Sequence, residues 1–272
     1  MLQVILLPLL AVLGGVGGFF LRRWELSTAF EASGLAISWA PASIALVVLS
    51  AILVLALALL CRGTKHELKN YGDAFSAPRS WFYLAVSAVA AAILLVAGLF
   101  GLKSEFDSGT PRLLHLLFYG MCVVSFISVL TVVPNNFRAR GRQYSLALLL
   151  PAYTCCLWLV TFYQQRAADP VVLDYVYELF AIVCTLLGFY FAAGFSFGRA
   201  KVWRCAFFCL LSVYFSIVTL ADGHDWSIRL LFLFSTLYQL ANVTVLLYHA
   251  FVKGPVPVPD ESNKTQEVTP DE

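Results

Sequence analysis

The side chains best suited to chemistry in this chain are carboxylates and amides that interrupt long apolar stretches. Asp174 and Glu178 stand near the start of one stretch, four positions apart and therefore on one face of a helix. Gln239 and Asn242 lie near the middle of another. A carboxylate inside a membrane usually faces a partner or a water-filled cavity, so it marks an ion or solute pathway by default. We therefore take Glu178, Asp174, Gln239 and Asn242 as candidate ligand or coupling residues.

These side chains also have a purely structural interpretation. Glu178 lies about one and a half turns inside its helix, close enough to the end to pair with an arginine such as Arg166 or Arg229. The amides of Gln239 and Asn242 need hydrogen-bond partners in hydrocarbon. They therefore either join neighbouring helices or form the floor of a ligand cavity. The sequence leaves both interpretations open.

Small residues continue the helix face that begins with Asp174 and Glu178. They recur at spacings of three and four: Ala181, Thr185, Gly188 and Ala192. The next apolar stretch carries a similar face, which consists of Cys205, Cys209, Ser212, Ser216 and Thr219. Small side chains let helix backbones approach closely in lipid. We therefore expect these two helices to pack on each other or on a common third helix.

The first apolar stretch contains four glycines between residues 14 and 18. Gly14 and Gly18 form a GxxxG pattern, which in an apolar helix favours close contact with another helix. Together with Gly188, Ser212 and Ser216, these two glycines are the candidate helix-packing residues.

The cysteines and histidines form no pattern typical of a metal or cofactor site. Cys205 and Cys209 share a helix face, but no third ligand accompanies them, so we interpret them as packing residues. His115 begins its stretch and His249 ends another, which separates their depths in the membrane by about 30 Å and excludes a haem between them. We expect neither a metal nor a cofactor, and we find no catalytic residue.

The stretches that carry these residues are long enough to span a membrane. The 272-residue chain is 60% hydrophobic and only 12% charged, unlike an ordinary soluble domain. Eight stretches have the roughly 20 apolar residues that cross a bilayer. They are Leu2–Leu21, Trp39–Cys61, Trp81–Leu102, Leu113–Val133, Ser145–Tyr163, Leu173–Phe197, Val202–Ala221 and Trp226–Phe251. Unbroken apolar runs favour helices over barrel strands, so the predicted fold class is an all-α polytopic bundle of about eight transmembrane helices.

Residues 1–252 are expected to form one transmembrane domain, and the proline-rich and then acidic residues 253–272 a disordered tail. If the eight stretches alternate in direction, twelve of the eighteen Lys and Arg residues lie on the side that holds both termini. Positive residues favour the cytoplasmic side, which predicts a plasma-membrane protein with both termini in the cytoplasm. The first stretch alone predicts the opposite, because Arg22 and Arg23 follow it and no Lys or Arg precedes it.

Composition and motifs leave three classes of function. The net charge of +2 does not indicate nucleic acid as a partner, and the residue patterns of nucleotide-binding loops, zinc proteases and serine hydrolases do not occur. A non-catalytic membrane module, meaning a sensor, scaffold or anchor, fits the small helix faces and implies a membrane-protein partner or a second copy. A small-molecule permease would use Glu178 as its coupling carboxylate. An enzyme needs convergent groups, and only scattered ones occur. The sequence favours the module, with the permease as the alternative.

Overall fold

The computed structural model describes residues 1–31, 35, 37, 39–63, 66–139, 145–167 and 171–254. Within these residues the protein is an all-α bundle, which confirms the predicted fold class. This part of the chain holds eight helices that are long and apolar enough to cross a membrane. The predicted tail from residue 255 onward lies outside the described residues.

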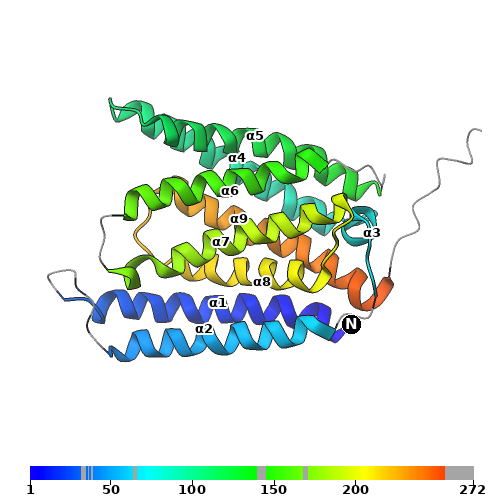
Figure 1. The fold of residues 1–272 in the computed structure, drawn as a ribbon, viewed down its shortest axis with the longest axis horizontal. Helices are drawn as coiled ribbons and strands as arrows, with labels where there is room; N and C mark the ends of the chain where they lie inside the picture. Colours follow the sequence, from blue (N-terminus) through cyan, green and yellow to red (C-terminus); the bar gives the residue numbers. More distant parts are fainter. Residues whose placement is uncertain are drawn as a thin grey trace, which may run out of the picture.

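The eight long helices run back and forth through the bundle (Figure 1). They are α1 Leu2–Thr28, α2 Pro41–Leu60, α4 Trp81–Asp107, α5 Leu113–Phe137, α6 Ser145–Arg166, α7 Val172–Gly194, α8 Val202–Thr219 and α9 Trp226–Tyr248. The described residues also form four short helical segments: η1 Cys61–Gly63, α3 Tyr71–Phe75, η2 Phe195–Phe197 and η3 His249–Lys253. We call the end of the bundle that holds Met1 and Gly254 the termini end, and the opposite one the far end.

Local sequence explains where several helices begin and end. Pro41 occupies the first turn of α2, where its missing N–H costs no hydrogen bond. The Ser80 hydroxyl accepts a hydrogen bond from the backbone N–H of Tyr83 at the start of α4. The turn η2 is followed by Gly198, whose φ of +68° is a left-handed conformation that glycine adopts without strain. The chain can therefore turn sharply from α7 into α8.

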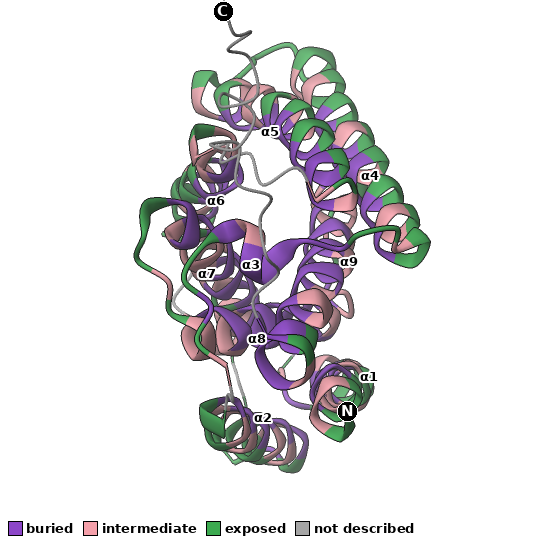
Figure 2. Ribbon diagram, turned by 90° about the vertical axis from the view of Figure 1, so that its right-hand side faces the viewer, coloured by how far each residue is buried: buried purple, intermediate pink, exposed green. Residues whose placement is uncertain are grey.

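Six of the long helices form a ring. Around it, α4 packs on α5, α5 on α6, α6 on α7, α7 on α8, α8 on α9, and α9 on α4. Figure 2 looks along the bundle from the termini end and shows these helices around a common interior. The hairpin of α1 and α2 lies outside the ring, with α1 packed on α8.

Helices α7, α8 and α9 meet through small residues. The hydroxyls of Thr185 on α7 and Ser212 on α8 are 2.7 Å apart. A Cβ at Gly188 would lie 2.9 Å from the amide nitrogen of Gln239 on α9, so α9 approaches α7 closely at this point. Ser216 is buried on α8, and its hydroxyl has no hydrogen-bond partner among the described residues. The predicted packing of the two small faces is confirmed for α7 and α8.

The glycines of α1 contact two different helices. A Cβ at Gly14 would lie 2.5 Å from Leu53 of α2, whereas one at Gly18 would lie 2.6 Å from Val218 of α8. The GxxxG pattern therefore does not mark a single helix pair. Its glycines let α1 fit between α2 and α8.

The short helix α3 covers the ring interior at the termini end (Figure 2). Its residues Tyr71 and Phe75 line the innermost void of the ring together with side chains of α5, α6, α7 and α9. Asn136, near the end of α5, donates hydrogen bonds to the hydroxyls of Tyr71 and Tyr83, both at 3.0 Å. These bonds attach α3 to α5 and α4 and keep this end of the ring closed.

Candidate functional site

A polar cavity of about 410 Å³ opens at the far end of the ring. Its lining comes from α4, α5, α6, α7, α9 and the loop between α8 and α9. Seven side chains in this lining carry a carboxylate, a guanidinium or an imidazole: Glu105, Arg112, His115, Arg166, Glu178, His224 and Asp225. So many ionisable groups at the mouth of a membrane helix bundle are typical of a site for a charged or polar ligand.

Glu178 lies in the wall of this cavity and is buried. Its Oε2 is 3.5 Å from Nη2 of Arg166, and its Oε1 is 3.8 Å from Nδ1 of His224. Arg166 is one of the two arginine partners that the sequence suggested. Both distances are those of ion pairs rather than of short hydrogen bonds, so Glu178 keeps the capacity to bind a further partner.

Asp174 lies one turn before Glu178, nearer to solvent. Its Oδ2 accepts a hydrogen bond from Nη1 of Arg166 at 3.0 Å, and its side chain is 36% exposed. Arg166 therefore contacts both carboxylates of α7. A shared guanidinium offsets the repulsion between two neighbouring acids.

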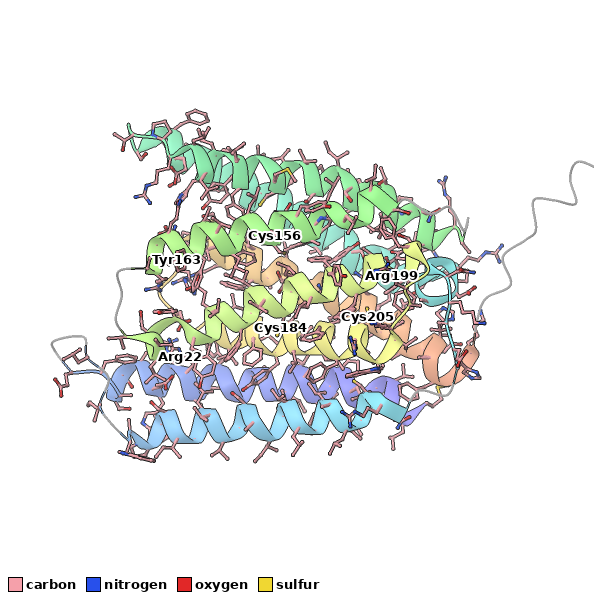
Figure 3. All side chains as sticks on the ribbon, viewed as in Figure 1. Arg22, Cys156, Tyr163, Cys184, Arg199 and Cys205 are labelled. Carbon is pink, nitrogen blue, oxygen red and sulfur yellow. The ribbon has the colours of Figure 1, made fainter. Side chains whose placement is uncertain are left out.

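Arg22 of α1 is fully buried and fastens α1 to the ring at the far end (Figure 3). Its Nε donates to Oδ1 of Asp222, and its Nη1 donates to Oε2 of Glu25, both at 2.7 Å. The same guanidinium donates to the carbonyl oxygens of Leu173 and Asp174 at the start of α7. The planar, multiply donating guanidinium thus holds α1, α7 and the segment after α8 together.

The contacts of Arg22 and Glu178 join into one closed network. Asp222 Oδ2 lies 3.7 Å from Nε2 of His224, and His224 in turn lies beside Glu178. From Glu178 the contacts return to Arg22 through Arg166 and the backbone carbonyl of Asp174. We call this set the charge network; its members are Arg22, Glu25, Arg166, Asp174, Glu178, Asp222 and His224.

Another wall of the cavity carries a second carboxylate–imidazole pair. His115 Nδ1 is 2.7 Å from Oε1 of Glu105, whose Oε2 accepts a hydrogen bond from the backbone N–H of Arg112 at 3.3 Å. This contact orients the imidazole. The other ring nitrogen, Nε2, is buried without a hydrogen-bond partner among the described residues. His115 lines both the cavity and the void beneath it, so this nitrogen is suited to bind a water or a ligand.

Three small voids continue from the cavity along the interior of the ring. Their volumes are about 10, 20 and 20 Å³, each enough for about one water molecule. Glu178 lines both the cavity and the first void. The first and second voids share Phe118 and Trp158, and the second and third share Pro151 and Phe189. The voids therefore form an interrupted line from the far-end cavity to α3.

Aromatic side chains interrupt this line below the cavity. The Trp158 ring on α6 lies 4.8 Å from that of Phe232 on α9 and 6.2 Å from that of Phe118 on α5. All three side chains are buried, and we call them the aromatic constriction. The Phe232 ring also lies 5.5 Å from the His224 ring. The constriction and the charge network are thus in contact.

The two predicted amides occupy different surroundings on α9. Gln239 Nε2 donates to the carbonyl oxygen of Thr185 at 3.3 Å, which joins α9 to α7. Asn242 Oδ1 accepts a hydrogen bond from the Tyr83 hydroxyl at 3.4 Å, and Asn242 also lines the innermost void. Asn242 therefore reaches the ring interior, whereas the contacts of Gln239 are those of a helix-joining residue.

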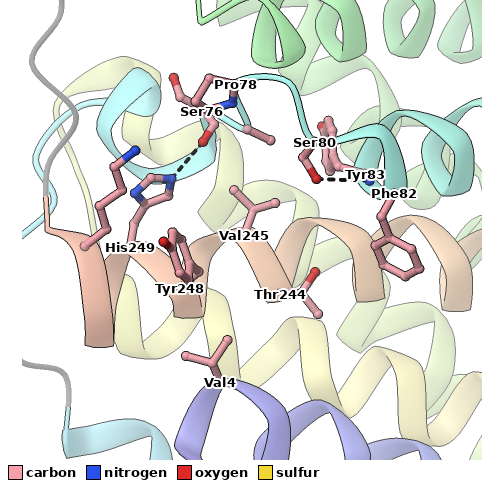
Figure 4. Close-up of a pocket in the computed structure, with 12 residues that line it drawn as sticks. Val4, Ser76, Pro78, Ser80, Phe82, Tyr83, Thr244, Val245, Tyr248 and His249 are labelled. Atoms are coloured by element: carbon pink, nitrogen blue, oxygen red, sulfur yellow. Dashed lines mark hydrogen bonds between the residues drawn. The ribbon is translucent and has the colours of Figure 1, made fainter. Parts of the chain in front are cut away.

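A second cavity, of about 420 Å³, lies at the termini end between α1, α4 and α9 (Figure 4). Apolar side chains such as Phe82 and Val245 contribute much of its lining. At its edge, Nε2 of His249 is 2.7 Å from the carbonyl oxygen of Ser76. This cavity gathers fewer charged side chains than the one at the far end, which is therefore the stronger candidate site.

Sequence reasoning missed Arg22, Asp222 and His224 as site residues. Arg22 lies just beyond the predicted end of the first stretch, but α1 continues to Thr28. Asp222 and His224 lie in a loop that separates two predicted spans. The one available signal was the spacing of Arg22 and Glu25, which are three positions apart and meet on one helix.

No group of three or more His, Cys, Asp or Glu residues is placed to hold a metal ion in the described part of the chain. The sulfur atoms of Cys205 and Cys209 lie 4.0 Å apart in the packed interior. No family model, curated protein or solved structure matches the chain. The helices themselves define the class: this is a multi-pass α-helical membrane protein, with a charged cavity at one end of its helix ring.

Proposed function

We propose that the protein is a permease for a small polar solute and that the far-end cavity is the solute entrance in the conformation described. One observation carries this proposal: the cavity continues into a line of voids inside a ring of six helices. A non-catalytic module, the other function that the sequence favours, needs packed helix faces but not a polar cavity that leads into the ring. The geometry therefore supports the permease better.

The residues of the line have distinct proposed roles. Glu178 is the coupling carboxylate, because it is buried where the cavity meets the first void and its distances to Arg166 and His224 are 3.5 and 3.8 Å. Asp174 serves as a second acid held by the same arginine. Asn242 is a neutral ligand near the termini end, and Gln239 keeps α7 and α9 together.

Transport requires that the ring open at the other end. In the described conformation the aromatic constriction and α3 lie between the cavity and the termini end. We propose that these two barriers open in turn, which exposes the inner voids first to one side of the membrane and then to the other. A carrier of this kind has at least two conformations of comparable free energy.

We also propose that the protein resides in the plasma membrane with both termini in the cytoplasm, so that the cavity opens to the outside. The excess of basic residues at the termini end supports this orientation. An impermeant thiol reagent applied to intact cells is expected to label Ser108→Cys, at the far end of α4. Labelling of Ser262→Cys from outside would instead show that the protein has the opposite orientation in the membrane.

Cysteine accessibility tests the permease directly. In a variant whose seven cysteines are replaced, Gln165→Cys in the cavity is expected to react readily with an impermeant reagent from the far-end side. Ser235→Cys, which lines the second void, is expected to react slowly from that side. Ser128→Cys, which lines the innermost void, is expected to react from the termini side. Absence of reaction at both inner positions from either side would favour the module.

The aromatic constriction provides a matched control. Trp158→Ala is expected to speed the reaction of Ser235→Cys from the far-end side, because it removes the largest ring between the cavity and the second void. Trp81→Ala removes an exposed tryptophan that is 73% accessible and should leave the rate unchanged. Equal rates in both variants would contradict the proposed path.

A further inference from the structure

The charge network contains more acids than bases. It holds four carboxylates and two guanidinium groups: Glu25, Asp174, Glu178 and Asp222 against Arg22 and Arg166. Three of these carboxylates are buried, those of Glu25, Glu178 and Asp222. A buried carboxylate without a counter-charge is strongly disfavoured. Each of the three contacts a guanidinium, but two guanidinium groups are shared among four carboxylates, so the network has a net negative charge that further positive charge would balance.

Unpartnered atoms indicate where that charge binds. Asp222 Oδ2 and His224 Nε2 are both buried without a hydrogen-bond partner, and they face each other at 3.7 Å. Across the same imidazole, Nδ1 faces Oε1 of Glu178 at 3.8 Å. Both ring nitrogens therefore point at carboxylates. An imidazole carries an N–H on both nitrogens only when it has bound a proton.

We infer that Glu178, His224 and Asp222 together hold one exchangeable proton, so that a proton is the coupling ion of the permease. With the proton bound, the imidazolium offers an N–H to each carboxylate. Without it, one of the two carboxylates faces a ring nitrogen that has no hydrogen to donate. The coupling role rests on the proposed function, but proton binding by these three residues does not.

Charged groups on every neighbouring segment surround His224. Besides Glu178 and Asp222, they are Arg22, Glu25, Arg166, Asp174, Asp225 and Arg229, while Glu105, Arg112 and His115 stand in another wall of the same cavity. Carboxylates outnumber guanidinium groups in this set. The surrounding charge is therefore net negative, which is the sign that a bound proton balances.

Phe232 links the proton site to the aromatic constriction. Its ring contacts both the His224 ring, at a centroid distance of 5.5 Å, and the Trp158 ring, at 4.8 Å. In this proposal, proton binding shortens the contacts between the imidazole and the two carboxylates, and any accompanying movement of the ring changes its contact with Phe232. Protonation therefore acts on the barrier between the cavity and the inner voids.

Infrared difference spectroscopy on the full-length protein in lipid vesicles tests this inference without any solute. Spectra are recorded while the buffer pH is stepped at constant sodium concentration. We expect carboxyl bands that disappear in Glu178→Gln and in Asp222→Asn to titrate together with an imidazole band that disappears in His224→Gln. The midpoint of the carboxyl bands is expected to shift in His224→Gln and to stay unchanged in Asp107→Asn, which removes an exposed acid.

Two results would overturn the proton site. One is that the midpoint of the Glu178 and Asp222 carboxyl bands stays unchanged in His224→Gln. The other is that sodium, added at constant pH, causes the same spectral change as a pH step. If a neutral variant does not fold, Glu178→Asp retains the acid and must still move the shared midpoint. Because no transport is measured, the permease can fail in the accessibility test while the proton site stands, and the reverse also holds.

Discussion

Arg22 joins parts of the chain that lie up to 200 positions apart in the sequence. Its guanidinium pairs with Glu25 and Asp222, bonds the start of α7 and lies 5.3 Å from the Tyr177 ring centroid. The side chain is fully buried, so each of these contacts forms away from bulk water. Removal of the charge leaves two buried carboxylates without their partner.

Arg22→Gln is therefore expected to lower the free energy of unfolding by about 3–5 kcal/mol, the usual cost of breaking a buried ion pair. Thermal unfolding of the purified protein in detergent micelles measures this loss. The adjacent Arg23→Gln is the control, because Arg23 is exposed and its replacement should change stability by less than about 0.5 kcal/mol. Equal losses in the two variants would contradict the assigned role of Arg22.

Gly101 makes room for Tyr119, which lines the cavity. A Cβ at Gly101 would lie 2.1 Å from the Tyr119 ring, whereas a Cβ at Gly120 on α5 meets no atom within 4 Å. Gly101→Ala should destabilise the protein by about 1–3 kcal/mol through overpacking. Gly120→Ala should leave it unchanged or slightly more stable. Unfolding midpoints of the two variants in the same micelles check this prediction, and a stable Gly101→Ala would show that the contact is not tight.

Single residues divide clearly into those that the sequence identifies and those that it does not. Glu178 can be identified from the sequence, because a carboxylate inside an apolar helix is unusual. This holds whichever helices pack around it. Asp222 and His224 lie in a polar loop, where such residues are ordinary. Their importance arises only because α1 packs on α8 and brings Arg22 to Asp222, while His224 lies beside Glu178 of α7. Hydropathy carries no information on helix order.

The short helix α3 is held by polar contacts that cannot be predicted from its own sequence. Tyr71 is buried, and it contacts Asn136 and lines the innermost void. Burial raises the pKa of the Tyr71 hydroxyl well above its ordinary value, and the neighbouring Tyr83 and Tyr238 raise it further. The folded protein therefore keeps the Tyr71 proton more tightly than the unfolded chain does.

This difference predicts a loss of stability in alkaline solution. Because the folded pKa is the higher one, the contribution of Tyr71 is fully present below the ordinary tyrosine value of about 10 and is lost as the pH rises above it. Tyr71→Phe should therefore flatten the fall in unfolding free energy above pH 10. Tyr190→Phe, at an exposed position, is the control. An unchanged slope in Tyr71→Phe would show that Tyr71 does not ionise on unfolding.

The long helices were predictable because an apolar run of membrane-spanning length has few other conformations. Their neighbours were only partly predictable. The small faces of α7 and α8 indicated that these helices pack together, as the contact between Thr185 and Ser212 confirms. The glycines of α1 indicated close packing, but not that Gly14 meets α2 while Gly18 meets α8. Contact partners depend on the arrangement of all eight helices.

The ring of α4 to α9 encloses an interior. This interior exists only in the assembled ring, because no single helix or helix pair can enclose it. Its far end holds a polar cavity, the aromatic constriction lies directly below this cavity, and α3 covers the termini end. A static module would keep this arrangement under all conditions. A permease must exchange it for one in which the termini end opens and the far end closes.

Distances between spin labels across both ends of the ring test this exchange most directly. Phe106 and Tyr163 are exposed positions on α4 and α6 at the far end, and Trp81 and Leu146 are exposed positions on the same helices at the termini end. In lipid vesicles we expect two populations of distances for each pair, one that fits the described conformation and one that is shorter at the far end and longer at the termini end. A single narrow distance for both pairs, at every pH at which the protein stays folded, would contradict the permease.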